Sequence, residues 1–216
     1  MEQTTKATVR FWLPGGIIFT LLISGLLLTT AIVSGSLTHS LSPSWQDRLG
    51  FAPQDLFTPH WDRMFSSALV TSGGKGFWPA FGATVSLVLI AEWLSGTRGA
   101  ALAFWIAHLG ASIGGSLLTW LAAQFSNSTM LNEIYTLRDV GPSAGYFGCI
   151  GLIFAQLPRP WKYLAGLAIM AGLIGGMIYS AYYGHTIDVS AGLAHLVAFP
   201  LGWSIAYIPF LKSPRA

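Results

Sequence analysis

The sequence predicts an all-α membrane protein, a bundle of six transmembrane helices in which the fourth is short. Of the 216 residues, 53% are hydrophobic and only 9% are charged, whereas a soluble domain usually carries about 25% charge. The mean hydropathy is +0.58. The sequence has no internal repeat and no segment whose composition suggests a second domain, so we expect a single polytopic membrane domain over residues 1–216.

The charged residues exclude several function classes. The net charge of +3 comes from scattered side chains, which do not form a phosphate-binding patch, so no nucleic-acid partner is expected. The one cysteine, Cys149, cannot form an internal disulfide or a cysteine-based zinc site. We therefore expect no metal and no cofactor, and the lipid bilayer as the surrounding partner.

Six apolar runs, bounded by turn residues or charges, are the expected spans. The first follows Lys6 and Arg10, as in a signal peptide, but it is too long for such a peptide and has no clear cleavage site. The fourth is shorter than the roughly 20 residues that a hydrocarbon core of about 30 Å requires. The runs cover residues 12–35, 77–94, 99–124, 143–157, 162–182 and 189–210.

The connecting segments predict orientation and contact with the membrane. Residues 36–76 mix aromatic with charged residues, so we expect an interfacial loop between spans one and two. Seven of the 11 Lys and Arg residues lie in the termini and even-numbered loops. The positive-inside rule then puts both termini in the cytoplasm. We expect an integral protein of the bacterial inner (plasma) membrane. Small-residue spacings, such as Gly172 with Gly176, predict close helix packing.

Four polar residues inside the expected spans need an explanation, because such residues are costly in a membrane. Glu92 closes the second run near Arg98, which favours an ion pair or a helix-end contact. His108 in the third run is expected to hydrogen-bond a neighbouring helix. The other two polar residues are Ser143 and His195.

Ser143 and His195 are expected at one depth. Ser143 lies 16 residues before Arg159, and His195 lies 17 residues before Lys212. At 1.5 Å per residue, both are roughly 24–26 Å from the first cytoplasmic basic residue. A hydroxyl and an imidazole at one depth can form a nucleophile and its base, although two packing residues can also match by chance.

The residues around Ser143 add to this hypothesis. Gly141 and Pro142 precede Ser143 at the start of the short fourth helix, where backbone N–H groups have no partner within the helix. The amides of Ser143 and Ala144 can therefore face an oxyanion. Residues 141–145 (GPSAG) also match the G-x-S-x-G elbow of α/β-hydrolases. That motif needs a preceding strand, which a membrane helix bundle does not supply, so we reject this interpretation.

Four motifs over about residues 60–210 together resemble the rhomboid intramembrane serine proteases. Residues 61–69 (WDRMFSSAL) look like the stretch entering the second helix of the family, and residues 91–96 (AEWLSG) look like the motif closing it. Residues 141–144 (GPSA), followed by Gly151, look like the nucleophile motif. Residues 194–202 (AHLVAFPLG) look like the histidine motif of the sixth helix.

The resemblance implies a rhomboid-like bundle with an outward-opening aqueous cavity. Ser143 would be the nucleophile and His195 the general base, a dyad without a carboxylate. Phe147, one turn after Ser143, matches the aromatic residue that stacks on the histidine. The supporting positions are Phe147, Gly141, Gly151, Gly202 and Glu92.

The sequence also departs from the family. Ala144 and Ala198 replace glycines where helices four and six meet. The positions that usually supply oxyanion side chains hold Gly76 and Ala80, which have no side-chain donor. Losing one such donor can cost about 10²–10³ in rate. Substitute donors are expected, if anywhere, at Thr71, Ser72 or Lys75.

Three functions follow, in order of preference. The first is a serine endopeptidase that cleaves a membrane-anchored protein substrate near the extracytoplasmic interface; a rhombosortase-like form, which processes the C-terminal anchors of exported proteins, lies within it. The second is a pseudoprotease that binds transmembrane segments without cleaving them. The third is a small transporter or channel, which would need polar groups near the midplane and repeat symmetry.

Overall fold

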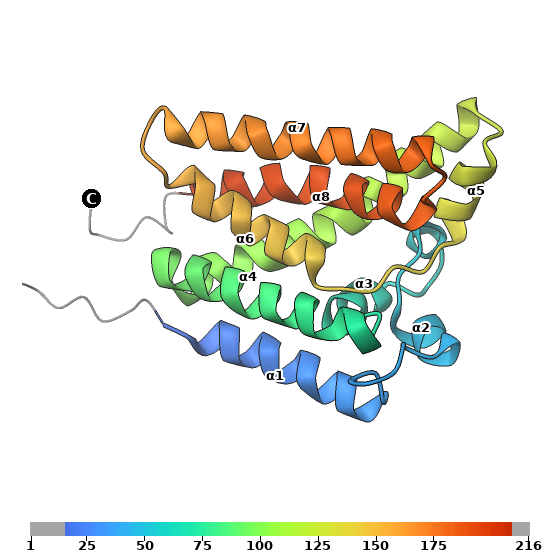
Figure 1. Cartoon of the computed structure of the whole chain (residues 1–216), viewed down its shortest axis with the longest axis horizontal. Helices are drawn as coiled ribbons and strands as arrows, with labels where there is room; N and C mark the ends of the chain where they lie inside the picture. Colours follow the sequence, from blue (N-terminus) through green and yellow to red (C-terminus); the bar gives the residue numbers. More distant parts are fainter. Residues whose placement is uncertain (1–15, 209–216) are drawn as a thin grey trace, which may run out of the picture.

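The computed structural model describes residues 16–208, and helices dominate this part of the chain (Figure 1). It contains eight α-helices, which confirms the all-α class. The expected runs at 12–35 and 189–210 extend beyond the described residues. The α-helices are α1 (Ile18–Val33), α2 (Pro43–Leu49), α3 (Arg63–Ser66), α4 (Phe77–Phe125), α5 (Thr129–Thr136), α6 (Ser143–Ala155), α7 (Trp161–Tyr182) and α8 (Thr186–Ile205).

Helix α4 consists of two arms that reverse direction at Gly96. Gly96 has φ 75° and ψ 167°, a conformation that a residue with a Cβ atom rarely adopts. The arms, residues 77–95 and 97–125, occupy the second and third expected spans. The second arm runs antiparallel to α6: Gln156 near the end of α6 donates to Ser95 Oγ at 2.7 Å, whereas Gly145 near its start lies against Phe104.

Glu92 holds α1 against the first arm of α4. Its carboxylate accepts the backbone N–H groups of Phe19 (3.0 Å) and Thr20 (2.8 Å), in the first turn of α1. It also accepts the hydroxyls of Thr20 and Thr97. The first N–H groups of a helix lack partners within the helix, and a carboxylate there also meets the positive end of the helix dipole. The helix-end contact is therefore present, while no ion pair joins Glu92 to Arg98 in the described residues.

Glycines bring α6 and α8 into backbone contact. A Cβ on Gly202 would collide with the backbone of Gly148, and one on Gly151 would collide with the backbone of Phe199 and Trp203. The two helices that carry Ser143 and His195 are thus fixed to each other. The expectation for α7 is wrong: nothing lies within 4 Å of a Cβ built on Gly172 or Gly176.

The connection between α1 and α4 is a folded segment with a buried charge cluster. It holds α2, α3 and the short 3-10 helices Pro53–Phe57, Ser67–Leu69 and Gly74–Gly76. Asp55 is only 2% exposed and pairs with both Arg63 and Arg138. Arg138 belongs to the α5–α6 connector, so the cluster ties this segment to the residues that lead into Ser143.

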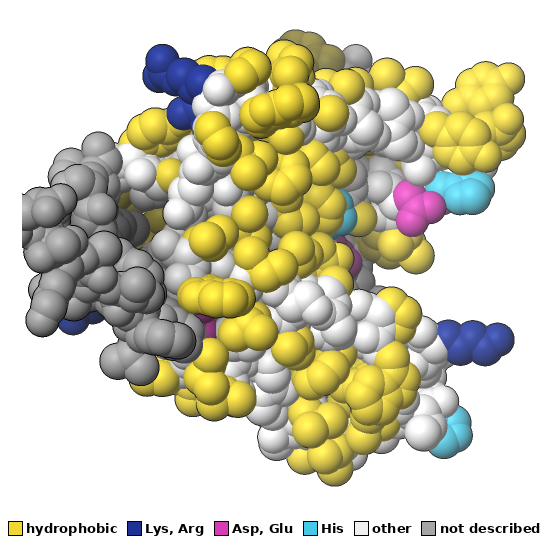
Figure 2. Space-filling model, turned by 60° about the vertical axis from the view of Figure 1, so that its left-hand side comes forward, with side chains coloured by type: hydrophobic (Ala, Val, Ile, Leu, Met, Phe, Trp, Pro, Cys, Tyr) yellow, Lys and Arg dark blue, Asp and Glu magenta, His cyan; other side chains and the backbone are white. Residues whose placement is uncertain are grey.

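The membrane prediction is supported in part. Among the described residues, two helical stretches are long and apolar enough to cross a bilayer: Gly74–Phe125, which contains the Gly96 reversal, and Trp161–Tyr182. Helices α1 and α6 are apolar but shorter, with 16 and 13 residues. Six spans are therefore not demonstrated. Figure 2 shows hydrophobic side chains over most of the face in view, with Lys and Arg side chains near its ends.

Candidate active site

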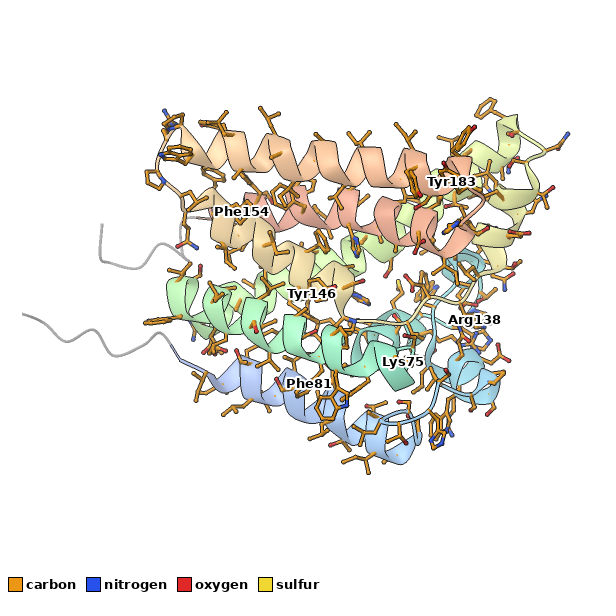
Figure 3. All side chains as sticks on the ribbon, viewed as in Figure 1. Lys75, Phe81, Arg138, Tyr146, Phe154 and Tyr183 are labelled. Carbon is orange, nitrogen blue, oxygen red and sulfur yellow. The ribbon has the colours of Figure 1, made fainter. Side chains whose placement is uncertain are left out.

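Ser143 is the first residue of α6, and the preceding connector is firmly held. Gly141 donates its N–H to Ser67 O at 2.8 Å, and Asp139 exchanges two backbone hydrogen bonds with Phe51. The φ of Gly141 is +144°, which favours glycine. Figure 3 shows the labelled Arg138 at the end of the bundle where α6 begins, while Tyr146 and Phe154 follow along α6.

His195 lies on α8 and stacks on Phe147 of α6. The ring centroids are 3.9 Å apart and the rings are 14° from parallel, so the expected aromatic contact is present. Phe147 is one helical turn after Ser143, which places the imidazole beside the first turn of α6. Ala194, the residue before His195, lines the same cavity as Ser143.

The expected hydrogen bond between Ser143 and His195 is not formed in the described structure. His195 Nε2 is buried and has no hydrogen-bond partner. Leaving a buried polar atom unpaired costs about 1–3 kcal/mol, and the Phe147 stack together with the α6–α8 packing holds the ring there nonetheless. Hydrogen bonds between catalytic groups are often long before substrate binds.

The first turn of α6 presents unpaired N–H groups. Tyr146 donates its N–H to Pro142 O, whereas the structure gives the amides of Ser143, Ala144 and Gly145 no hydrogen-bond partner. Such amides can stabilise an oxyanion. The methyl groups of Ala144 and Ala198 fit: both residues are buried in one cluster with Ala107 and Ala111.

A cavity whose wall is mostly apolar, with several polar side chains among the lining residues, opens beside Ser143. Its volume is about 60 Å³. The wall combines residues from the segment after α1, the second arm of α4, the α5–α6 connector and both α6 and α8. The polar lining residues are Ser67, His108, Ser112, Ser116, Thr119, Asp139, Ser143 and Ser190.

Sequence reasoning missed Asp139 as a site residue. It lies four positions before Ser143, in a connector, where a carboxylate is ordinary. Only the cavity brings it to the site. Burial raises the pKa of its carboxyl to about 6 from an ordinary value of 3.8. The four-residue spacing to Ser143 was the only signal in the sequence.

The loop that was expected to supply substitute oxyanion donors lies away from the cavity, whereas His108 lines it. The loop holding Thr71, Ser72 and Lys75 does not line the cavity; it packs on the segment after α1, where Leu41 donates its N–H to Ser72 O at 2.8 Å. Its proposed donors are therefore wrongly placed in this structure. His108 Nε2 contacts Met64 O at 2.9 Å and Ser67 Oγ at 3.3 Å, so its contact with a neighbouring segment is present.

No group of three or more His, Cys, Asp or Glu side chains in residues 16–208 is arranged to hold a metal ion. Comparisons with protein-family models, with curated proteins and with solved structures found no match to this chain.

Proposed function

We propose that the protein is an intramembrane serine endopeptidase of the rhomboid type, cleaving a membrane-anchored protein near the extracytoplasmic interface. The observation that carries this proposal is the pairing of α6 and α8: Ser143 begins α6, and Phe147 one turn later stacks on His195. The resemblance predicts this contact between Phe147 and His195. Two packing residues that lie at the same depth by chance would not be expected to make it.

Six passes through the bilayer accompany this proposal. They are α1, the two arms of α4, α6, α7 and α8. Exposed aromatic side chains support it, because such residues gather at membrane interfaces. One end of the bundle has Trp161, Tyr163 and Tyr207; the other has Tyr179, Tyr182 and Tyr183.

The chemistry follows from the side chains. His195 takes the proton of the Ser143 hydroxyl, and Oγ attacks the scissile carbonyl carbon. The amides of Ser143 and Ala144 stabilise the oxyanion. His195 then gives its proton to the leaving amine, which departs as the C–N bond breaks. A water molecule, deprotonated by the same imidazole, hydrolyses the acyl-enzyme.

Labelling of the purified protein in detergent by an alkyl fluorophosphonate tests this function. We expect Ser143 to be labelled, Ser143→Ala to remove the label, and His195→Ala to slow labelling by at least about 10²-fold, because it removes the base. Ser204→Ala, which changes an exposed serine of α8, is the matched control and keeps the wild-type rate. A folded wild-type protein that resists the reagent would contradict the proposal.

The second candidate is a rhomboid-like pseudoprotease that binds transmembrane segments without cleaving them. Two observations favour it: His195 Nε2 makes no hydrogen bond, and Gly76 and Ala80 offer no oxyanion side chain. An unlabelled but folded protein that still binds a membrane-anchored segment equally well with Ser143→Ala would support this candidate.

A further inference from the structure

The cavity beside Ser143 is positioned to receive one side chain of a substrate. In a substrate, the carbonyl carbon that Ser143 Oγ attacks is bonded to the Cα atom of the residue before the scissile bond, so the side chain of that residue lies close to Ser143. Ser143 and Ala144, which would hold that carbonyl, both line the cavity. The side chain on the amino-terminal side of the scissile bond therefore enters it.

The size of the cavity limits that side chain. About 60 Å³ holds roughly four to six water molecules, since each needs about 10–15 Å³. A methyl, hydroxymethyl or similarly small group fits, whereas an aromatic or long basic side chain does not. Phe51, Leu193 and several alanines close the wall around the polar groups.

Asp139 supplies the cavity with a hydrogen-bond acceptor that is not paired with a basic side chain. No Lys, Arg or His of the described residues forms an ion pair with it. The adjacent Arg138 is engaged elsewhere, with Asp47 at 3.2 Å, with Gly50 O at 3.3 Å and with Asp55. The Asp139 carboxyl meets the backbone N–H of Val140 and pairs with no cation, and a carboxylate has about four acceptor positions, so it can accept a further hydrogen bond from a group that enters the cavity.

We propose that Asp139 is a specificity residue that selects a small hydroxyl-bearing side chain, serine or threonine, immediately before the scissile bond. This inference rests on the proposed function. A small apolar residue would fill the same space but offer the Asp139 carboxyl no hydroxyl donor. A site built to hydrogen-bond a hydroxyl discriminates strongly against the analogue that lacks it.

The test uses peptidyl diphenyl phosphonates, which phosphonylate an active serine, with Ala, Ser, Val or Thr as the recognised side chain. Each protein is judged by its own ratio of labelling rates, Ser over Ala and Thr over Val, so that general changes in reactivity cancel. We expect both ratios to be at least about 10 for wild type. In Asp139→Leu they fall to about 1 or below, and in Asp139→Asn they take an intermediate value, because one acceptor oxygen remains.

Asp188→Asn is the matched control, because this exposed carboxylate lies at the same end of the bundle; its ratios should equal those of wild type. Ratios near 1 in wild type, or ratios unchanged in both Asp139 variants, overturn the inference while alkyl fluorophosphonate labelling of Ser143 leaves the proposed function standing. If the alkyl reagent itself fails on the folded wild type, the proposed function fails, and this inference fails with it. The Asp139→Asn variant decides the outcome if Asp139→Leu does not fold.

Discussion

Among single residues, Glu92 concentrates four hydrogen bonds on one fully buried carboxylate. Each oxygen accepts one backbone N–H of α1 and one threonine hydroxyl. In Glu92→Gln, one oxygen becomes an NH2 group that faces two donors. We expect the free energy of unfolding to fall by about 1–3 kcal/mol, measured as a lower thermal midpoint in detergent.

Glu133→Gln is the control for this prediction, because Glu133 is exposed and its carboxylate accepts one hydrogen bond, from the Thr186 hydroxyl; its effect should stay within about 0.5 kcal/mol. A Glu92→Gln variant as stable as wild type would show that the carboxylate does not hold α1 in place.

The contacts of individual residues differ in how far the sequence could predict them. The Phe147–His195 stack was predictable because the serine, the phenylalanine and the histidine lie in recognisable motifs on two helices. Asp139 was not, because its cavity is assembled from segments far apart in the chain. A helix-end contact of Glu92 was among the predictions, but its burial and its partner were not, since the capped N–H groups of Phe19 and Thr20 carry no sequence signal.

Among helices, the α6–α8 contact is the element pair on which the site depends. A methyl on Gly202 or Gly151 would meet backbone atoms of the opposite helix, which cannot rotate away as a side chain can. We expect Gly202→Ala and Gly151→Ala each to cost about 1–3 kcal/mol and to slow fluorophosphonate labelling of Ser143, because the helices carrying Ser143 and His195 must separate.

The α7 variants Gly172→Ala and Gly176→Ala supply the comparison for these changes. Open space surrounds both positions, and alanine favours a helix over glycine by up to about 1 kcal/mol, so neither should destabilise the protein. Equal effects at Gly202 and Gly172 would refute the role assigned to the α6–α8 contact.

The same glycines show what helix patterns reveal. Long apolar runs located α1, the two arms of α4, α6, α7 and α8, and a run shorter than a membrane span marked α6, whereas the short helices α2, α3 and α5 have no such run and were not predicted. Small-residue spacing predicted close packing on α6, where it holds, and on α7, where it does not. Spacing places glycines on one face, but it does not show whether another helix covers that face. The sequence likewise shows a gap between two apolar runs around Gly96, but not that the chain reverses direction there without leaving the helical conformation for more than one residue.

For the whole molecule, the ends of the bundle differ in their basic side chains. Helix α1 begins and α8 ends at the same end (Figure 1), where Arg98, Arg159 and Lys162 also lie. At the other end, Arg63 and Arg138 are paired with Asp55, and Arg138 also with Asp47. Among the described residues, the basic residues that form no ion pair are Arg98, Arg159 and Lys162 at the end where α1 begins, against Arg48 and Lys75 at the other end (Figure 3). This difference has the same direction as the count taken over the whole sequence.

This asymmetry predicts that Ser143 faces the extracytoplasmic side. Lys and Arg near helix ends are retained in the cytoplasm, so a fluorescent-protein fusion after Lys212 should fluoresce and an alkaline phosphatase fusion there should be inactive. The opposite result is expected for fusions in residues 126–128, the connector that precedes α5 and Arg138. Swapping the two reporters at each position controls for expression. An active phosphatase after Lys212 would reverse the inferred orientation of the protein in the membrane, because α6 begins at the end of the bundle opposite to the end of α8. Ser143 would then open toward the cytoplasm, and cleavage near the extracytoplasmic interface would be excluded even if the serine reacts with fluorophosphonate.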